Sequence, residues 1–272
     1  MKIALVNMRP KIADKKANLK KMEGFLSKIS ADLVIFGEIT LTGYRCKDEL
    51  RNLAETINGP SVKYMKNLAK KRDCYIVFGM PLLDSNIKGL INNAAILLHP
   101  DGKADVYKKW FLPNTGPFEE KLFFDEGEEL PIFKTKFGKI GMSICYDIYY
   151  PEIFRSYVLQ GADMIICISA SPSTTRAYFE KLIPARALEN TIFMIYVNIV
   201  GTQEDLVFWG GSQVYDPLGN LIVKAPYFKE GITTCDIDLN QLHLARGSRP
   251  LIRDIRPEIY HDLYELARRK TK

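Results

Sequence analysis

The stretch KIGMSICYDIYYPE, residues 139–152, joins a strand-like segment to a helix start and places a cysteine between them. Residues 140–144 are mostly apolar, as in a buried strand, whereas Pro151 and Glu152 are typical of the first turn of a helix. Cys145 therefore lies where a strand ends, a position from which side chains commonly reach a ligand. A helix terminus or a nearby cation lowers the pKa of a thiol, so we expect Cys145 to be a nucleophile with a lowered pKa.

The alternative for Cys145 is a small buried side chain, which is the commonest state of a lone cysteine. Cys74, Cys167 and Cys235 fit that description better, because each lies within or beside an apolar run. The five cysteines are widely spaced and contain no CxxC pair, which predicts free thiols in a reducing compartment. The sequence thus favours a cytoplasmic location.

On both sides of this stretch, short apolar runs alternate with longer amphipathic ones, a pattern typical of a mixed sheet covered by helices. The expected strands are residues 2–7, 33–37, 75–80, 93–98, 103–107, 164–168, 192–198 and 232–237, with hairpins over 131–144, turning at 137–138, and 212–223, turning at 216–220. The expected helices are residues 14–30, 61–71, 151–160 and 177–190.

The segments between these elements indicate how many domains the chain forms. Residues 110–129 lack periodicity and are expected to form a long ordered loop, which in a compact domain is usually functional. No linker rich in Gly, Ser or Pro separates two domains. We expect one α/β domain of two similar halves over residues 1–272, with a core over about residues 1–245 and a C-terminal tail over 246–272.

Composition excludes several classes of protein. With 272 residues, 47% of them hydrophobic, the chain can bury a substantial core, so a disordered or fibrous protein is excluded. The net charge of +6 comes largely from the expected first helix and the last residues, and no nucleic-acid-binding motif is present. No apolar run is long enough to span a membrane. The three histidines are isolated, which argues against a metal site, and no glycine motif supports a nucleotide.

Two further charged positions follow apolar runs. Glu38 directly follows LVIFG (33–37), where a carboxylate is costly unless it is paired or lines a cleft. There it can exchange a proton with a thiol and a leaving amine, the alternative being a solvated loop acid. Lys108 and Lys109 follow the expected strand 103–107 and point to opposite faces, so one of them can stabilise an oxyanion. Spacing alone does not choose between the two lysines.

In their order and content these motifs resemble the nitrilase, or carbon-nitrogen hydrolase, superfamily along nearly the whole chain. The resemblance rests on GEITLTGY (37–44), YKKWFLPNTGPFEEKLFF (107–124), SICYDIYYPEIFR (143–155), PARALEN (184–190), YVN (196–198), GGSQVYDPLGN (210–220) and RGSRPLIRDIRPEIY (246–260). It implies an αββα sandwich that forms four layers and pairs with another subunit as a homodimer or higher homo-oligomer. It also implies that the enzyme needs no cofactor and has a Glu-Lys-Cys triad of Glu38, Lys109 and Cys145.

The resemblance implies further site residues. It selects Lys109 and places Glu120, or its neighbour Glu119, as a second glutamate that orients the lysine. The backbone N–H of Tyr146 is implied as an oxyanion donor. The implied substrate-binding residues are Tyr44, Ser169, Ser171, Arg176 and Trp209, with Tyr146 beside them. Arg176 can hold a substrate carboxylate bidentately, its alternative being a solvated arginine at a helix start.

The function implied by the resemblance is hydrolysis of a small linear amide through a cysteine thioester, releasing ammonia or an amine and a carboxylic acid. GEITLTGY, ISASPS (168–173) and VGTQEDLVFWGGS (200–212) are similar to the glutaminase domain of glutamine-dependent NAD synthetases. Tyr146 and Thr115 depart from that group, and the chain ends where that domain ends. The alternatives are an ammonia-supplying glutaminase subunit of a synthetase, an N-carbamoyl amine hydrolase, a nitrilase, and a non-catalytic binding role.

Overall fold

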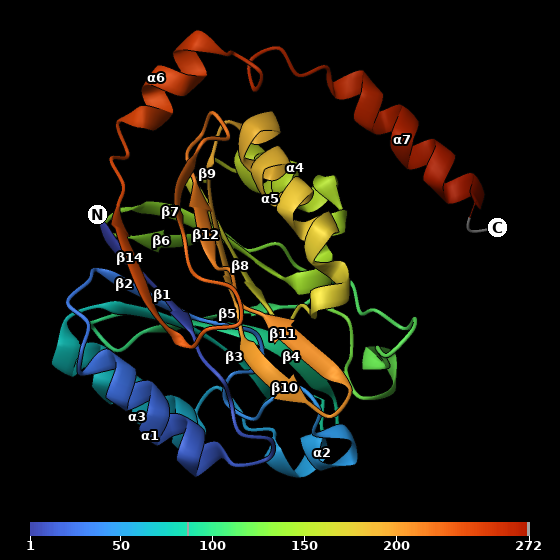
Figure 1. Cartoon of the computed structure of the whole chain (residues 1–272). Coiled ribbons are helices and arrows are strands. Elements are labelled where there is room, and N and C mark those ends of the chain that lie inside the picture. The colour runs from blue at the N-terminus through green and yellow to red at the C-terminus, as the bar shows by residue number, and fades with distance from the viewer. Residues whose placement is uncertain (86, 271–272) are drawn as a thin grey trace.

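The computed structural model describes residues 1–85 and 87–270, and its strands form two six-stranded sheets and one hairpin (Figure 1). The first sheet has the order β14 (Gly231–Asp236), β1 (Lys2–Asn7), β2 (Leu33–Phe36), β3 (Tyr75–Leu83), β4 (Ile91–Leu98), β5 (Ala104–Lys108). The second has the order β13 (Leu221–Lys224), β12 (Gln213–Tyr215), β9 (Phe193–Asn198), β8 (Met164–Ser169), β7 (Gly138–Ile144), β6 (Phe133–Thr135). The hairpin consists of β10 (Val200–Gln203) and β11 (Leu206–Trp209).

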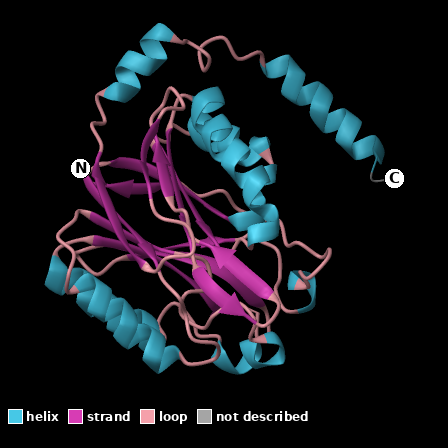
Figure 2. Cartoon of the chain, viewed as in Figure 1, coloured by secondary structure: helices cyan, strands magenta, loops and turns pink. Residues whose placement is uncertain are grey.

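The helices lie outside the strands (Figure 2). They are α1 (Lys15–Leu26), α2 (Leu50–Leu53), α3 (Pro60–Arg72), α4 (Pro151–Leu159), α5 (Arg176–Asn190), α6 (Gln241–Ser248) and α7 (Pro257–Lys270). Short 3₁₀ turns occupy Lys47–Glu49, Glu120–Leu122, Cys145–Tyr149 and Ser173–Thr175. Whereas α1 to α5 pack near the sheets, α6 and α7 follow an arc around the outside of the molecule (Figure 1).

The two halves of the chain build their sheets in the same way. In the first sheet β1, β2 and β3 are parallel, and β4 and β5 continue antiparallel. In the second sheet β7, β8 and β9 are parallel, and β12 and β13 continue antiparallel. At the other edge of each sheet an antiparallel strand is added, β14 beside β1 and β6 beside β7. This repeated order confirms the expected two similar halves.

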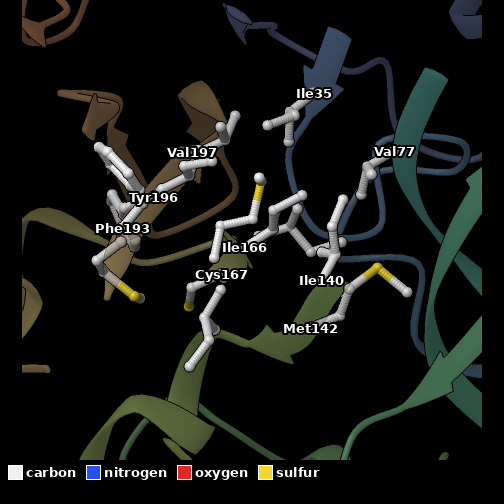
Figure 3. Packing of buried hydrophobic residues seen from close by; sticks show 14 of the residues in the cluster. Ile35, Val77, Ile140, Met142, Ile166, Cys167, Phe193, Tyr196 and Val197 are labelled. Carbon is white, nitrogen blue, oxygen red and sulfur yellow. The ribbon is translucent and has the colours of Figure 1, made fainter. Parts of the chain in front are cut away.

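Alternation along the strands of the first sheet divides their side chains between two hydrophobic cores. In β2, Ile35 packs in the core between the sheets, whereas Val34 and Phe36 pack in the core beneath α1 and α3. Figure 3 shows the inner core, where Ile35 and Val77 from the first sheet approach residues of the second sheet. The far side of the second sheet packs against α4 and α5. The layers are therefore helix, sheet, sheet, helix, which confirms the αββα sandwich.

Several element boundaries differ from the sequence expectation. The first helix ends at Leu26, where the Ser27 hydroxyl donates to the Gly24 carbonyl, although Ile29 still packs on the core. β3 continues through Pro81, which is tolerated because its neighbour β2 has already ended on that side. The hairpin before Cys145 turns at residues 136–137, since Thr135 pairs with Gly138.

The hairpin β10–β11 was not expected from the sequence. Its turn consists of Glu204 and Asp205, with Glu204 at a φ of 52°, and it contains no glycine. The usual sequence signal for a two-residue hairpin turn is Asn-Gly or Asp-Gly, so that signal does not identify this turn. Outside the turn, Gln203 is buried and its side-chain oxygen accepts hydrogen bonds from the backbone N–H groups of Tyr44 and Arg45.

Candidate active site

Cys145 occupies a strained turn between β7 and α4. Its φ is 47°, a left-handed conformation that costs a side-chain-bearing residue about 1–3 kcal/mol and is found mainly at functional sites. The side chain is 7% exposed. A 3₁₀ turn follows, and Pro151 then begins α4. The strand, the turn and the helix therefore present one thiol at the end of the second sheet.

Glu38 lies at the end of the first sheet and is held by three hydrogen-bond donors. Its Oε1 accepts from Asn93 Nδ2 at 2.7 Å and from Lys109 Nζ at 2.8 Å. Its Oε2 accepts from the backbone N–H of Ala170 at 2.6 Å, directly after β8 of the other sheet. The side chain is fully buried. These contacts place the carboxylate between the ends of the two sheets.

A close backbone approach fixes the turn that carries Glu38. Gly79 of β3 lies so near that a Cβ atom there would be 2.3 Å from the backbone nitrogen of Ile39 and 2.7 Å from the Cα of Glu38. Ile39 itself has a φ of 47°. A side chain at position 79 would therefore displace the Glu38 turn, which gives Gly79 a reason to be glycine.

Lys109 lies between two buried carboxylates. Its Nζ is 2.8 Å from Glu38 Oε1 and 2.8 Å from both Oε1 and Oε2 of Glu120. Burial alone would lower the pKa of Lys109, but Glu120 and Glu38 outweigh it and raise the pKa above its ordinary value. Lys108 points to the other face of the sheet and pairs with Asp84 at 2.6 Å. Lys109 is therefore the lysine that faces the other charged groups.

Glu120 completes the buried cluster and lies in the long loop after β5. It is 4% exposed, whereas its neighbour Glu119 is exposed to solvent. The Tyr44 hydroxyl donates to Glu120 Oε1 at 2.7 Å. Burial raises the pKa of Glu120 to about 7, and Lys109 opposes that shift. The cluster contains two carboxyl groups, Glu38 and Glu120, but only one ammonium group, Lys109. One carboxylate is therefore in excess and can accept a proton.

The electrostatic state of Cys145 differs from the sequence expectation. The pKa of its thiol is raised well above the ordinary value, first by burial and then by Glu38, while Lys109 and Ser169 act in the opposite direction. The expected lowering by a helix terminus and a cation is therefore wrong, because desolvation and the neighbouring carboxylate dominate. The resting thiol is protonated near neutral pH, so attack requires a base that removes its proton.

The other predicted binding residues fall into three groups. Tyr44 contacts the charged cluster through Glu120, and Ser169 ends β8 immediately before the N–H group that binds Glu38. Ser171 and Trp209 are fully buried and bond to each other, with Trp209 Nε1 donating to Ser171 Oγ at 3.2 Å. Arg176 is partly exposed at the start of α5, its guanidinium 5.0 Å from the centroid of the Tyr227 ring.

Sequence reasoning missed two polar residues of this region. Asn93 lies inside β4, is fully buried, and binds Glu38, but an asparagine within an apolar strand carries no motif signal. Asp147 is fully buried two residues after Cys145. A carboxylate between apolar and aromatic residues is a signal that could have identified it, since such a group must be paired or bonded.

Two cavities differ in their relation to this cluster. A cavity of about 30 Å³, room for about one water molecule, is lined by Tyr44, Glu120 and Phe124 among others, and adjoins the cluster directly. A cleft of about 870 Å³ is lined by Asn92, Val106 and Lys108 among others. Because Lys108 and Lys109 point to opposite faces of the sheet, this larger cleft lies away from the charged cluster.

Among residues 1–85 and 87–270, no group of three or more His, Cys, Asp or Glu side chains is arranged to hold a metal ion. Within the same residues, no helix has the length and apolar character needed to cross a membrane.

Comparisons with known proteins place this geometry in context. The model of a family described as carbon-nitrogen hydrolase matches residues 2–246. A probable nitrilase of Schizosaccharomyces pombe is 34% identical over 269 residues, which cover 96% of this chain and 97% of that protein. A glutamine-dependent NAD(+) synthetase of Aquifex aeolicus is 31% identical over 251 residues, covering 89% of this chain but only 43% of the synthetase.

A solved structure has a fold similar to that of this chain. It is a mutant of the amidase from Nesterenkonia sp. AN1, in which acrylamide has added to the active site cysteine. It superposes with a TM-score of 0.83 and is 25% identical, covering 97% of this chain and 99% of that chain.

Proposed function

The chain belongs to the carbon-nitrogen hydrolase family, and we propose that it cleaves the C–N bond of a small linear amide through a thioester on Cys145. The observation that carries the proposal is the buried charged cluster, in which Lys109 donates hydrogen bonds to Glu38 and Glu120 and which interacts electrostatically with the buried thiol of Cys145. A thiol, a base and a fixed cation together supply the groups that attack on an amide carbon needs.

In the first half of the proposed reaction, Glu38 accepts the proton of Cys145 as Sγ attacks the amide carbon. Lys109 and the backbone N–H of Tyr146 stabilise the negative charge that develops on the amide oxygen, an effect worth about 3–4 kcal/mol for one well-placed donor. Glu38 then gives its proton to the leaving nitrogen. The C–N bond breaks, ammonia or an amine departs, and the acyl group remains on sulfur.

In the second half, water cleaves the thioester. Glu38 accepts a proton from the water as it attacks the acyl carbon, and then gives that proton to the Cys145 sulfur as the C–S bond breaks, so that sulfur leaves as the thiol. The product is a carboxylic acid, and the starting protonation states are restored. Glu120, which bonds Lys109 through both oxygens, keeps the ammonium group in place during both halves.

The test is ammonia release from a panel of amides, N-carbamoyl amines and nitriles, with the wild-type protein run beside Cys145→Ala. Turnover of at least one amide by the wild type alone supports the proposal. If both proteins are equally inert on the whole panel, and stay inert when a synthetase partner is added, the proposal fails. Activity that appears only with the synthetase would favour the glutaminase-subunit alternative, for which the similarity to the Aquifex aeolicus synthetase is the supporting observation.

The substrate class depends on Arg176, which we propose binds a carboxylate at the far end of the amide. For a substrate such as glutamine, Arg176→Ala is expected to lower kcat/KM about 10- to 100-fold, because a charged hydrogen-bonding pair is lost. A neutral amide of the same length should change less than about twofold. The matched variant is Lys181→Ala, which removes an exposed positive charge from the same helix. Equal losses on both substrates would contradict this role.

The C-terminal tail supports the proposed pairing of subunits. None of the described residues of α7 is buried, and Ile259, Leu263 and Leu266 form an apolar stripe, each more than half exposed. The outer side of α4 and α5 also exposes apolar residues, such as Leu159 and Tyr178. We propose that a second copy of the chain covers both surfaces, since exposed apolar surface of this kind marks an interface.

Leu263→Glu is expected to shift the protein toward a smaller assembly, because a carboxylate would be buried at the proposed contact. The measurement is molar mass in solution by light scattering over a range of protein concentrations. His261→Glu adds the same group on the polar side of α7 and should leave the molar mass unchanged. A monomeric wild-type protein, or identical masses for all three proteins, would contradict the pairing through α7.

A further inference from the structure

Asp147 is a buried carboxylate to which the proposed reaction gives no role. It lies in the 3₁₀ turn Cys145–Tyr149 and is fully buried. Its Oδ2 accepts from the backbone N–H of Ile144 at 2.9 Å and from the Tyr107 hydroxyl at 2.7 Å. Its Oδ1 accepts from the backbone N–H of Phe111 at 2.9 Å. All three donors are uncharged, so the position of this carboxylate requires an explanation.

The three donors come from both sides of the active site. Ile144 immediately precedes Cys145 and ends β7 of the second sheet. Tyr107 lies in β5 of the first sheet, and Phe111 follows Lys109 by two residues. One carboxylate thus connects the turn that carries the thiol to the segment that carries the ammonium group. These two segments are far apart in sequence and belong to different sheets.

An ionised carboxylate suits this position better than any neutral side chain of its size. Both of its oxygens accept and neither donates, which matches three converging donors. An asparagine would turn an NH₂ group toward one of them and leave that donor unpaired. Burial raises the pKa of Asp147 to about 6, and Lys109, Tyr107 and the two backbone N–H groups oppose the shift. The left-handed conformation of Cys145 must also be stabilised by its surroundings. The hydrogen bond from the Ile144 N–H to Asp147, directly before Cys145, contributes to this.

We propose that Asp147 is a positioning residue, which holds the Cys145 turn in register with Lys109 by binding Ile144, Tyr107 and Phe111 together. It does not touch the substrate or the reacting atoms. The inference rests on the proposed role of Cys145 as the nucleophile, but its effect on the geometry of the thiol can be measured without any amide substrate.

The experiment compares the second-order rate of Cys145 alkylation by iodoacetamide in Asp147→Asn, Tyr107→Phe and the wild type, with the modified residue identified by peptide mass spectrometry. We expect Asp147→Asn to react at least about tenfold more slowly and Tyr107→Phe about threefold more slowly, because only the thiolate is alkylated and its formation requires Cys145 to be held beside the base Glu38 and the cation Lys109. On an amide that the wild type hydrolyses, kcat should fall about as much or more, with KM within about threefold.

The matched control is Tyr157→Phe, which removes a buried hydroxyl that donates to the Met142 carbonyl of the same strand, β7, and makes no hydrogen bond to Asp147. Its alkylation rate should stay within about twofold of the wild type. Unchanged or faster alkylation in Asp147→Asn would overturn the inference. If Asp147→Asn does not fold, Tyr107→Phe decides, and a wild-type rate there overturns it. Slower alkylation in a protein that hydrolyses nothing on the panel would support the positioning role and reject the proposed function.

Discussion

Replacing Cys145 with alanine is expected to lower the rate of amide hydrolysis by about four orders of magnitude or more while the protein stays folded. The sulfur is the atom that carries the acyl group in both halves of the proposed reaction. Without it, Lys109 and the Tyr146 N–H group can still polarise the amide, but the covalent route is closed. The measurement is ammonia release under saturating substrate, with thermal unfolding recorded for the same samples.

The control for this prediction is another buried cysteine. Cys74 is 3% exposed and lies in the outer core beneath α1 and α3, on the far side of the first sheet from the site. Cys74→Ala should leave the rate within about twofold of the wild type, with at most a modest loss of stability. Hydrolysis by Cys145→Ala at a rate comparable to that of Cys74→Ala would show that a different group attacks the amide.

Lys109→Met is expected to lower the rate of amide hydrolysis about a thousandfold and to destabilise the fold. The substitution takes away the proposed oxyanion cation, whose loss alone costs about 10²- to 10³-fold in rate. It also leaves Glu38 and Glu120, both bonded to Lys109 Nζ at 2.8 Å, as buried carboxylates without their cation. Removing one partner from a buried ionic group costs about 3–5 kcal/mol of the free energy of unfolding.

The destabilisation of Lys109→Met should depend on pH in a specific direction. Burial already raises the pKa of Glu120 to about 7 with Lys109 beside it, and loss of that cation raises it further above the value in the unfolded chain, so protonation of Glu120 favours the folded state. The stability deficit relative to the wild type should therefore be large near pH 8 and should shrink toward about pH 5. Urea unfolding of both proteins at the two pH values measures it.

A double variant separates the two effects of Lys109. In Lys109→Met with Glu120→Gln, one of the two unpaired carboxylates becomes neutral, so stability near pH 8 should recover in part while activity stays absent. Recovery of activity together with stability would contradict the proposed role of Lys109 at the oxyanion. A deficit in Lys109→Met that grows as the pH falls would contradict the charge assignment of the cluster.

Local sequence patterns predict much of this architecture, because the central strands β2, β8 and β9 are each apolar runs. Alternation correctly implied that Lys108 and Lys109 face opposite sides, although only the family resemblance selected Lys109. The hairpin β10–β11 escaped prediction because its turn, Glu204 and Asp205, lacks glycine. Local patterns fail where the backbone conformation is determined by tertiary contacts.

The electrostatics of the site could not be predicted from local sequence. Asn93 binds Glu38 from a strand 55 residues later, so their contact depends on the folded sheet. The position of Cys145 before a helix predicts a lowered pKa for its thiol, yet burial and Glu38 raise that pKa. Both are properties of groups that come together only when the two sheets pack, and no spacing in the sequence encodes the degree of desolvation.

The most direct test is the intact mass of the protein quenched in acid during turnover of an amide that the panel identifies. The wild type should gain the mass of the acyl group minus one hydrogen, on the peptide that contains Cys145, and the gain should disappear when substrate is exhausted. Cys145→Ala should show no such species. Turnover with no acyl adduct even at the earliest quench times, and with Cys145→Ala still active, would contradict catalysis through a Cys145 thioester.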